Sequence, residues 1–144
     1  MVVGIGNDHH GIDIKNKIIK HLEEKNIQYV NYGCDNKDNT DYVDYAIKLC
    51  KGIQSKEVSL GILICGTGIG MCIVANKFKG IRCGKVATPE EARLTKEHNM
   101  ANVISLSEYT MNIDAIVDAF LDTKYSAEER HKRRVEKISR LENE

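Results

Sequence analysis

Short apolar runs alternate along the chain with segments whose apolar residues recur at helical spacing. The runs cover residues 2–5, 28–32, 60–65, 81–86 and 102–106. Because strands that alternate with helices build a parallel sheet covered on both faces, this pattern predicts a doubly wound, five-stranded parallel α/β fold. Ligands of such folds bind beyond the carboxyl ends of the strands. The residues that follow each run are therefore the candidates for a functional site.

Helical periodicity is clearest over residues 14–22, 42–49 and 113–121. The chain's one proline supports a further boundary, because Thr88-Pro89-Glu90-Glu91 is a capping box with proline at the first helical position. The last segment, residues 127–141, carries Val135, Ile138 and Leu141 on one face of a polar helix. We expect this C-terminal helix to dock on another surface, such as a second subunit.

The composition narrows the function. A length of 144 residues predicts a single domain over residues 1–144, and 21 basic residues balance 21 acidic ones, which disfavours nucleic acid and anionic membranes as partners. The N-terminus lacks the features of a signal peptide, and no run is long enough for a membrane helix. Five cysteines at irregular spacing, without a CxxC pair, predict reduced thiols and a cytoplasmic location.

The segment from Leu60 to Met71 joins a buried strand to a glycine-rich turn, with the sequence LGILICGTGIGM. Glycines allow successive backbone N–H groups to point at an anion, and a thiol beside such a site, here Cys65, is favoured as the thiolate. The glycines alone fit equally well a tight turn beside a buried, inert thiol. The spacing matches neither a Walker loop nor a dinucleotide fingerprint, so a nucleotide site is disfavoured.

Two polar pairs accompany this loop. Asp8-His9 follows the first run, and His98-Asn99 lies at the end of the helix that starts at Pro89. Together with Cys65 they supply a carboxylate, an imidazole and a thiolate, which form an acid–base set, although each pair alone is also consistent with polar surface. These residues are scattered singly along the chain, which disfavours a metal site.

Arg130 and Arg134 lie four residues apart and therefore on one face of the last predicted helix. Taken alone, this basic stretch is typical of a solvated helix surface or, less well, of a nucleic-acid patch. The interspersed Glu128, Glu129 and Glu136 weaken the nucleic-acid interpretation.

With these segments together, the chain resembles the type B ribose-5-phosphate isomerases and their relatives that act on galactose 6-phosphate and allose 6-phosphate. The resemblance runs nearly end to end. It is carried by residues 6–9, Asp41-Tyr42, residues 61–70, 75–77 and 80–82, residues 97–99 with Ala101-Asn102, and Arg130-His131 through Arg134-Val135. It implies a Rossmann-like fold, and homodimers or tetramers whose active sites are shared between subunits. It also implies that neither a metal nor an organic cofactor takes part.

The resemblance also implies residue roles. Cys65 would remove the proton next to the carbonyl, and His98, with Asp8 nearby, would open the sugar ring. The loop would hold the enediolate oxygens, and His9, Arg130 and Arg134 would bind the phosphate. The full expected set comprises catalytic Cys65, His98, Thr67 and Asp8, and substrate-binding Asp8, His9, Tyr42, Gly66, Thr67, Gly68, Ile69, Gly70, Asn99, Arg130 and Arg134.

Four positions depart from the pattern. Tyr109 replaces a phosphate-binding arginine, His10 a small residue, Val43 a proline and Met100 an aspartate. We therefore expect an aldose–ketose isomerase that acts through an enediolate. Ribose 5-phosphate, converted to ribulose 5-phosphate, is the expected substrate, although these four departures leave the choice of sugar open. The alternatives are an isomerase of allose or galactose 6-phosphate, a silent sugar-phosphate binding module, or a nucleic-acid or nucleotide binder.

Overall fold

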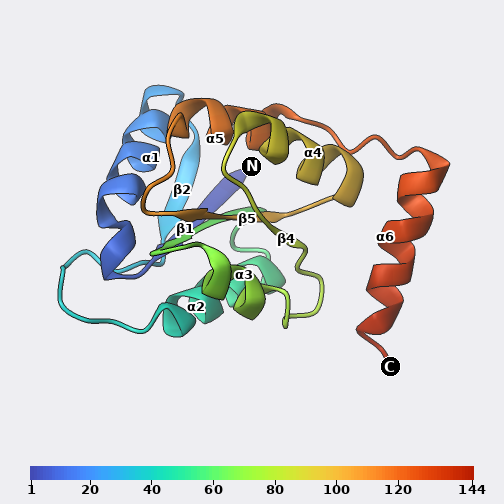
Figure 1. Ribbon diagram of the computed structural model, residues 1–144, viewed down its shortest axis with the longest axis horizontal. Coiled ribbons are helices and arrows are strands. Elements are labelled where there is room, and N and C mark those ends of the chain that lie inside the picture. Colours follow the sequence, from blue (N-terminus) through green and yellow to red (C-terminus); the bar gives the residue numbers. More distant parts are fainter.

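The computed structural model describes residues 1–144 and contains one parallel sheet of five strands in the order β2-β1-β3-β5-β4 (Figure 1). The strands are β1 (Val2–Asn7), β2 (Gln28–Asn31), β3 (Leu60–Cys65), β4 (Cys83–Lys85) and β5 (Val103–Ser107). All four pairings between neighbouring strands are parallel. The predicted fold class is confirmed.

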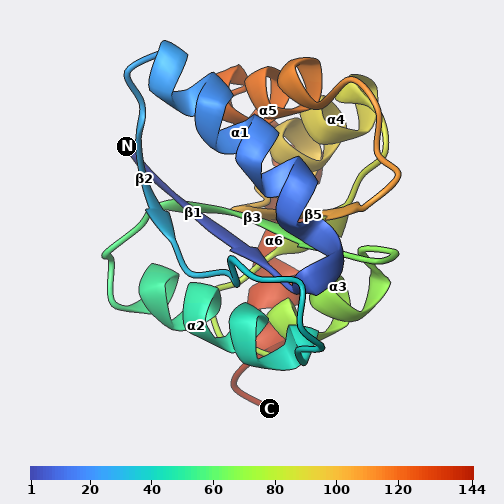
Figure 2. The ribbon, with the colours of Figure 1, turned by 90° about the vertical axis from the view of Figure 1, so that its left-hand side faces the viewer.

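Helices cover both faces of this sheet. They are the 3-10 turn η1 (His9–Gly11) and the α-helices α1 (Ile12–Glu24), α2 (Tyr42–Gln54), α3 (Ile69–Ala75), α4 (Pro89–Asn99), α5 (Ile113–Asp122) and α6 (Glu129–Leu141). Helices α1, α4 and α5 lie on one face, and α2 and α3 lie on the other (Figures 1 and 2). Each face has its own core, with Ile18 and Phe120 in one and Leu49 and Met71 in the other. The central strands are buried on both faces, which explains their unbroken apolar sequences.

The predicted boundaries hold within a few residues. β3 starts and ends where the sequence predicts, and Thr88 caps α4 by accepting a hydrogen bond from the Glu91 N–H at 3.1 Å. The fourth strand shortens from the predicted residues 81–86 to Cys83–Lys85, and α3 begins at Ile69 rather than near Met71. β4 pairs only with β5, at the edge of the sheet, and the residues on either side of it, Arg82 and Val86, each keep a backbone hydrogen bond to residues 102–105.

Helix α6 stands apart from the rest of the molecule (Figure 1). Only His131 and Val135 of this helix are buried, whereas Ile138 is 45% and Leu141 65% exposed. A cavity of about 650 Å³ lies between α6 and the sheet edge, and Phe78 and Arg82 help to line it. The helix thus presents an apolar stripe that this chain does not cover. None of the helices has the length and apolar character needed to cross a membrane.

Candidate active site

The sheet places its strand-order reversal at β1 and β3. The chain leaves β1 through α1 on one face to reach β2, and leaves β3 through α3 on the other face to reach β4. The ends of the two strands are joined, because Asp8 donates its backbone N–H to the carbonyl of Ile64 at 3.3 Å. Asp8 and Cys65 therefore lie side by side at the position where such folds bind ligands.

Cys65 is buried, with 4% of its surface exposed, and its sulfur faces the turn that follows β3. The backbone N–H of Gly68 donates to the Cys65 sulfur at 3.1 Å. The Thr67 hydroxyl accepts the Ile69 N–H at 3.2 Å and so holds the outer part of the turn. Hydrogen bonds to a charged acceptor are stronger than those to a neutral one, so this turn is built to hold negative charge beside the thiol.

Gly68 shapes this turn. Its φ is +79°, a left-handed conformation, and a Cβ built on it would lie 2.9 Å from the backbone carbon of Leu106 in β5. Gly80 has nearly the same φ, +80°, but a Cβ added there would meet no atom within 4 Å. An alanine would therefore strain the backbone at both positions, but only at position 68 would its Cβ also collide with another strand.

We expect Gly68→Ala to destabilise the protein more than Gly80→Ala. In both variants the left-handed backbone lowers the free energy of unfolding by about 1–2 kcal/mol. In Gly68→Ala the contact with Leu106 lowers it by about 1–3 kcal/mol more. Urea unfolding of the two variants measures the difference directly. Equal losses would show that β5 yields to the added methyl group.

Histidines and a tyrosine surround the turn. A Cβ at Gly66 would lie 3.8 Å from the His10 ring, and one at Gly70 would meet the ring of Tyr42. The His9 and His10 rings lie 4.1 Å apart, and His10 Nδ1 pairs with the Glu108 carboxylate at 2.9 Å. This part of the structure brings together the predicted residues Asp8, His9, Tyr42, Cys65, Gly66, Thr67, Gly68, Ile69 and Gly70.

A cavity of about 270 Å³ adjoins these histidines, and its lining includes Lys37, Glu108 and Tyr109. Lys37 and Glu108 were not predicted as site residues. Lys37 lies in a polar loop and Glu108 follows the last strand, and neither stands in a motif that distinguishes it from ordinary surface. The strand-end rule, applied to the last run, would have drawn attention to Glu108.

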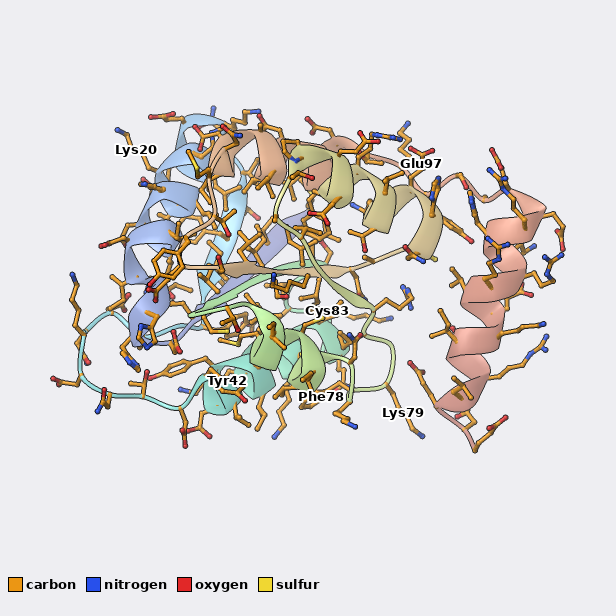
Figure 3. The ribbon with its side chains drawn as sticks, in the orientation of Figure 1. Lys20, Tyr42, Phe78, Lys79, Cys83 and Glu97 are labelled. Atoms are coloured by element: carbon orange, nitrogen blue, oxygen red, sulfur yellow. The ribbon has the colours of Figure 1, made fainter.

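The remaining predicted residues lie elsewhere. His98 and Asn99 end α4, and the chain then enters β5 at its amino end, where the Asn102 carbonyl accepts the Gly61 N–H at 2.9 Å. Gly61 lies near the start of β3 and Cys65 at its end, a separation of roughly 13 Å at ~3.3 Å per residue. Figure 3 shows Tyr42 and Glu97, the neighbour of His98, on different sides of the molecule. Within one chain, His98 is therefore not beside Asp8.

His98 belongs to a second cluster, near the amino ends of the strands, whereas Cys65 lies at their carboxyl ends. Its ring stacks on His131 with centroids 4.2 Å apart, and the His131 Nδ1 is 2.7 Å from the Ser126 hydroxyl. Burial, and then the nearby His98 and Arg130, lower the pKa of His131. Arg130 and Arg134 lie exposed on α6 beside it. His98, Asn99, Arg130 and Arg134 thus form a second group, separate from the Cys65 turn.

A doubly wound fold with a thiol and an N–H-lined turn at its strand-order reversal is typical of an enzyme that works by acid–base chemistry. The family model described as Ribose/Galactose Isomerase matches residues 3–138, and the chain belongs to this family. The predicted enzyme class, an isomerase, is confirmed with it.

Individual relatives agree. Ribose-5-phosphate isomerase B of Escherichia coli (strain K12) is 38% identical over 143 residues, covering 97% of this chain and 95% of that protein. The structure of ribose-5-phosphate isomerase B from Clostridium thermocellum matches with a TM-score of 0.94 and 36% identity, covering 99% of this chain and 98% of that one. The structure from Mycoplasma genitalium, with bound ribulose-5-phosphate, has a TM-score of 0.92 and 38% identity, covering 99% of this chain and 97% of that one.

Proposed function

We propose that the protein interconverts ribose 5-phosphate and ribulose 5-phosphate through an enediolate, with Cys65 as the base. The observation that carries this proposal is the Cys65 sulfur, which accepts the Gly68 N–H at 3.1 Å at the end of β3. The relatives named ribose-5-phosphate isomerase B, one of them with ribulose-5-phosphate bound, support the choice of sugar. The unpaired cysteines of the chain support a cytoplasmic location.

The chemistry needs a base and a stabilised anion. The Cys65 thiolate removes the proton from C2 of the open-chain aldose, the electrons move to O1, and the resulting enediolate takes the proton back at C1, while a hydroxyl proton passes from O2 to O1. The backbone N–H groups of Gly66 through Gly70 are the proposed donors to the enediolate oxygens. In this structure two of them have other acceptors, since the Gly68 N–H binds the Cys65 sulfur and the Ile69 N–H binds the Thr67 hydroxyl, so these two would have to change partner or share. A preorganised donor of this kind contributes about 3–4 kcal/mol to the transition state. No metal or organic cofactor is proposed in any step.

We propose further that two chains complete each active site, in a homodimer or in a tetramer built from such dimers. His98 and Asn99 lie near the amino ends of the strands, and Cys65 lies at the carboxyl end of β3. His98 can therefore open the sugar ring beside Cys65 only if it comes from a second chain. Arg130 and Arg134 lie on α6, which extends away from its own sheet with Ile138 and Leu141 exposed. These apolar side chains are suited to contact the second chain.

The test is a substrate panel. Purified protein is incubated in D₂O with ribose 5-phosphate, allose 6-phosphate or galactose 6-phosphate, and NMR follows both product formation and exchange at C2. We expect the fastest conversion with ribose 5-phosphate. Faster conversion of a six-carbon sugar would replace the substrate and keep the chemistry. Binding without exchange for all three would instead support a silent binding module.

We also expect binding of the substrate phosphate to depend on Arg134. An arginine–phosphate contact is charge-assisted and contributes about 1.5–3 kcal/mol, so Arg134→Ala should raise KM by roughly 10–150-fold with a smaller change in kcat. Arg133→Ala is the control, because Arg133 is also exposed on α6 and its side chain leaves the helix about 100° away from that of Arg134. Steady-state kinetics separates the two variants. An unchanged KM in Arg134→Ala would remove this arginine from the phosphate site.

A further inference from the structure

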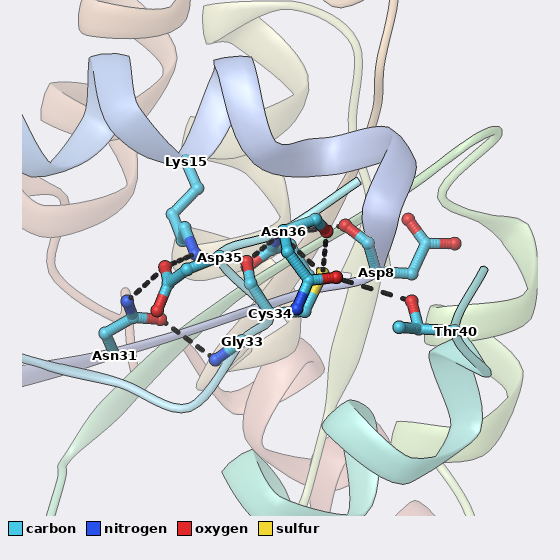
Figure 4. Close-up of polar contacts among 9 residues, drawn as sticks. Asp8, Lys15, Asn31, Gly33, Cys34, Asp35, Asn36 and Thr40 are labelled. Atoms are coloured by element: carbon cyan, nitrogen blue, oxygen red, sulfur yellow. Dashed lines mark hydrogen bonds and ion pairs between the residues drawn. The ribbon is translucent and has the colours of Figure 1, made fainter. Parts of the chain in front are cut away.

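Lys15 is among the largest fully buried side chains in the protein, with none of its surface exposed. It lies on α1, and its ammonium group donates to the backbone carbonyl of Cys34 and to the carboxylate of Asp35 (Figure 4). A buried charge is costly unless it is paired and hydrogen-bonded. The proposed reaction gives Lys15 no part, so its burial calls for another explanation.

The segment that Lys15 holds, residues 33–40, follows β2 and leads toward the site. Asn7, at the end of β1, donates its side-chain amide to the same Cys34 carbonyl at 3.0 Å. Asn31 donates to the Asp35 carboxylate at 3.0 Å, and Lys15 and then Asn31 hold the pKa of Asp35 below its ordinary value. The start of the segment is thus attached to α1, β1 and β2 at once (Figure 4).

The far end of the segment contacts His9. The Thr40 hydroxyl accepts the backbone N–H of His9 at 3.1 Å, and the Thr40 backbone N–H donates to His9 Nδ1 at 3.2 Å. The Thr40 hydroxyl also lies 3.9 Å from the sulfur of Cys34, the residue whose carbonyl Lys15 binds. The Thr40 hydroxyl also lies 3.3 Å from Nδ1. With Nδ1 accepting the Thr40 N–H, a neutral His9 would carry its proton on Nε2.

We propose that Lys15 is a positioning residue: through residues 34–40 it fixes Thr40, and Thr40 sets both the orientation of His9 and its Nε2–H tautomer. This inference rests on the proposed function, in which His9 binds the substrate phosphate. A neutral His9 in this tautomer presents an N–H donor to a phosphate oxygen. Lys15 itself touches no substrate.

The first test reads the tautomer without any reaction. ¹⁵N NMR of the imidazole nitrogens, recorded at pH 8, is compared for wild-type protein, Lys15→Met, Thr40→Ala and the control Lys20→Met, an exposed lysine on the same helix (Figure 3). We expect the Nε2–H form of His9 in wild-type and Lys20→Met, and a mixture of both tautomers in Lys15→Met and Thr40→Ala. Thr40 is in a loop, so Thr40→Ala tests the step from Thr40 to His9 even where Lys15→Met does not fold. In that case Asp35→Asn, at the exposed carboxylate that Lys15 binds, tests the step from Lys15 to the segment.

The second test is kinetic. We expect Lys15→Met and Thr40→Ala to raise KM for ribose 5-phosphate by up to about tenfold, less than His9→Ala, with kcat nearly unchanged, since a misplaced donor weakens one charge-assisted hydrogen bond. A wild-type tautomer and KM in both variants would overturn the inference. An unchanged KM in His9→Ala would instead remove His9 from the phosphate site, and the NMR result would still decide whether Lys15 positions it.

Discussion

Cys65→Ala is expected to lower kcat for ribose 5-phosphate by at least ~10²–10⁴-fold, the usual contribution of a positioned acid or base. The sulfur stands beside the turn that would carry the enediolate charge, and alanine leaves no group there to take the C2 proton. Binding should change by less than about tenfold, because the base acts mainly in the transition state. Calorimetry with ribose 5-phosphate on the inactive variant measures the binding.

The other cysteines supply the controls. Cys50 lies on the buried face of α2, and burial raises the pKa of its thiol to about 12. Cys72 is the sharper control, because a hydrogen bond with the Cys83 side chain lowers the pKa of the Cys72 thiol to about 6. Cys72→Ser and Cys50→Ala should each keep most of the wild-type kcat. Near wild-type turnover in Cys65→Ala would contradict the assignment of the base.

A mixture of two inactive variants is expected to recover activity. Cys65→Ala and His98→Asn each lose turnover alone, but a dimer with one chain of each has one site in which both residues are intact. Random assortment makes about half of the dimers mixed, and each of these has one good site of two, so specific activity should reach about a quarter of wild type. Unfolding and refolding the two variants together, followed by the isomerisation assay, measures this recovery.

The mixing experiment distinguishes an active site built by two chains from an active site built by one chain alone. If one chain supplied both residues, every chain in the mixture would carry a defect in its own site, and no activity would return. The control mixes Cys65→Ala with Arg133→Ala, since Arg133 is an exposed arginine to which neither group assigns a role. That mixture should fall to about half of the activity of Arg133→Ala alone, because half of its Cys65 residues are missing.

Much of the fold could be predicted because burial on both faces leaves a simple trace in the sequence. β3, with Ile62, Leu63 and Ile64 fully buried, has an unbroken apolar sequence and was predicted to the residue. β4 was overestimated, because Ile81 and Val86 are buried beside the strand rather than in it. Apolar residues in a sequence indicate which segments are buried. Where a strand ends depends on which backbone groups find hydrogen-bonding partners, and the sequence alone does not show these partners.

The site was predictable only in part. The strand-end rule brought Asp8 and Cys65 together, since Asp8 follows β1, Cys65 ends β3, and these two strands pair side by side. The separation of His98 from them follows from its place at the end of a helix, where the chain is about to enter the next strand. The contacts of Lys15 with Cys34 and of Thr40 with His9 join residues 19 and 31 positions apart, and no spacing rule connects them. Lys15 does leave one trace, a charge at a position where Ile12, Ile18 and Leu22 set an apolar stripe.

Strand β5 links the two groups of residues within each chain. Its amino end adjoins Asn102, just beyond His98 and Asn99, and its carboxyl end pairs Ser107 with Cys65 and continues to Glu108. In the proposed dimer, the five residues of β5, held between two neighbouring strands, would set the distance between two groups of residues that belong to different active sites. An insertion in β5 would change this spacing in both chains of a pair at once. In that dimer the length of β5, and not only the identity of the residues at its ends, would affect both active sites.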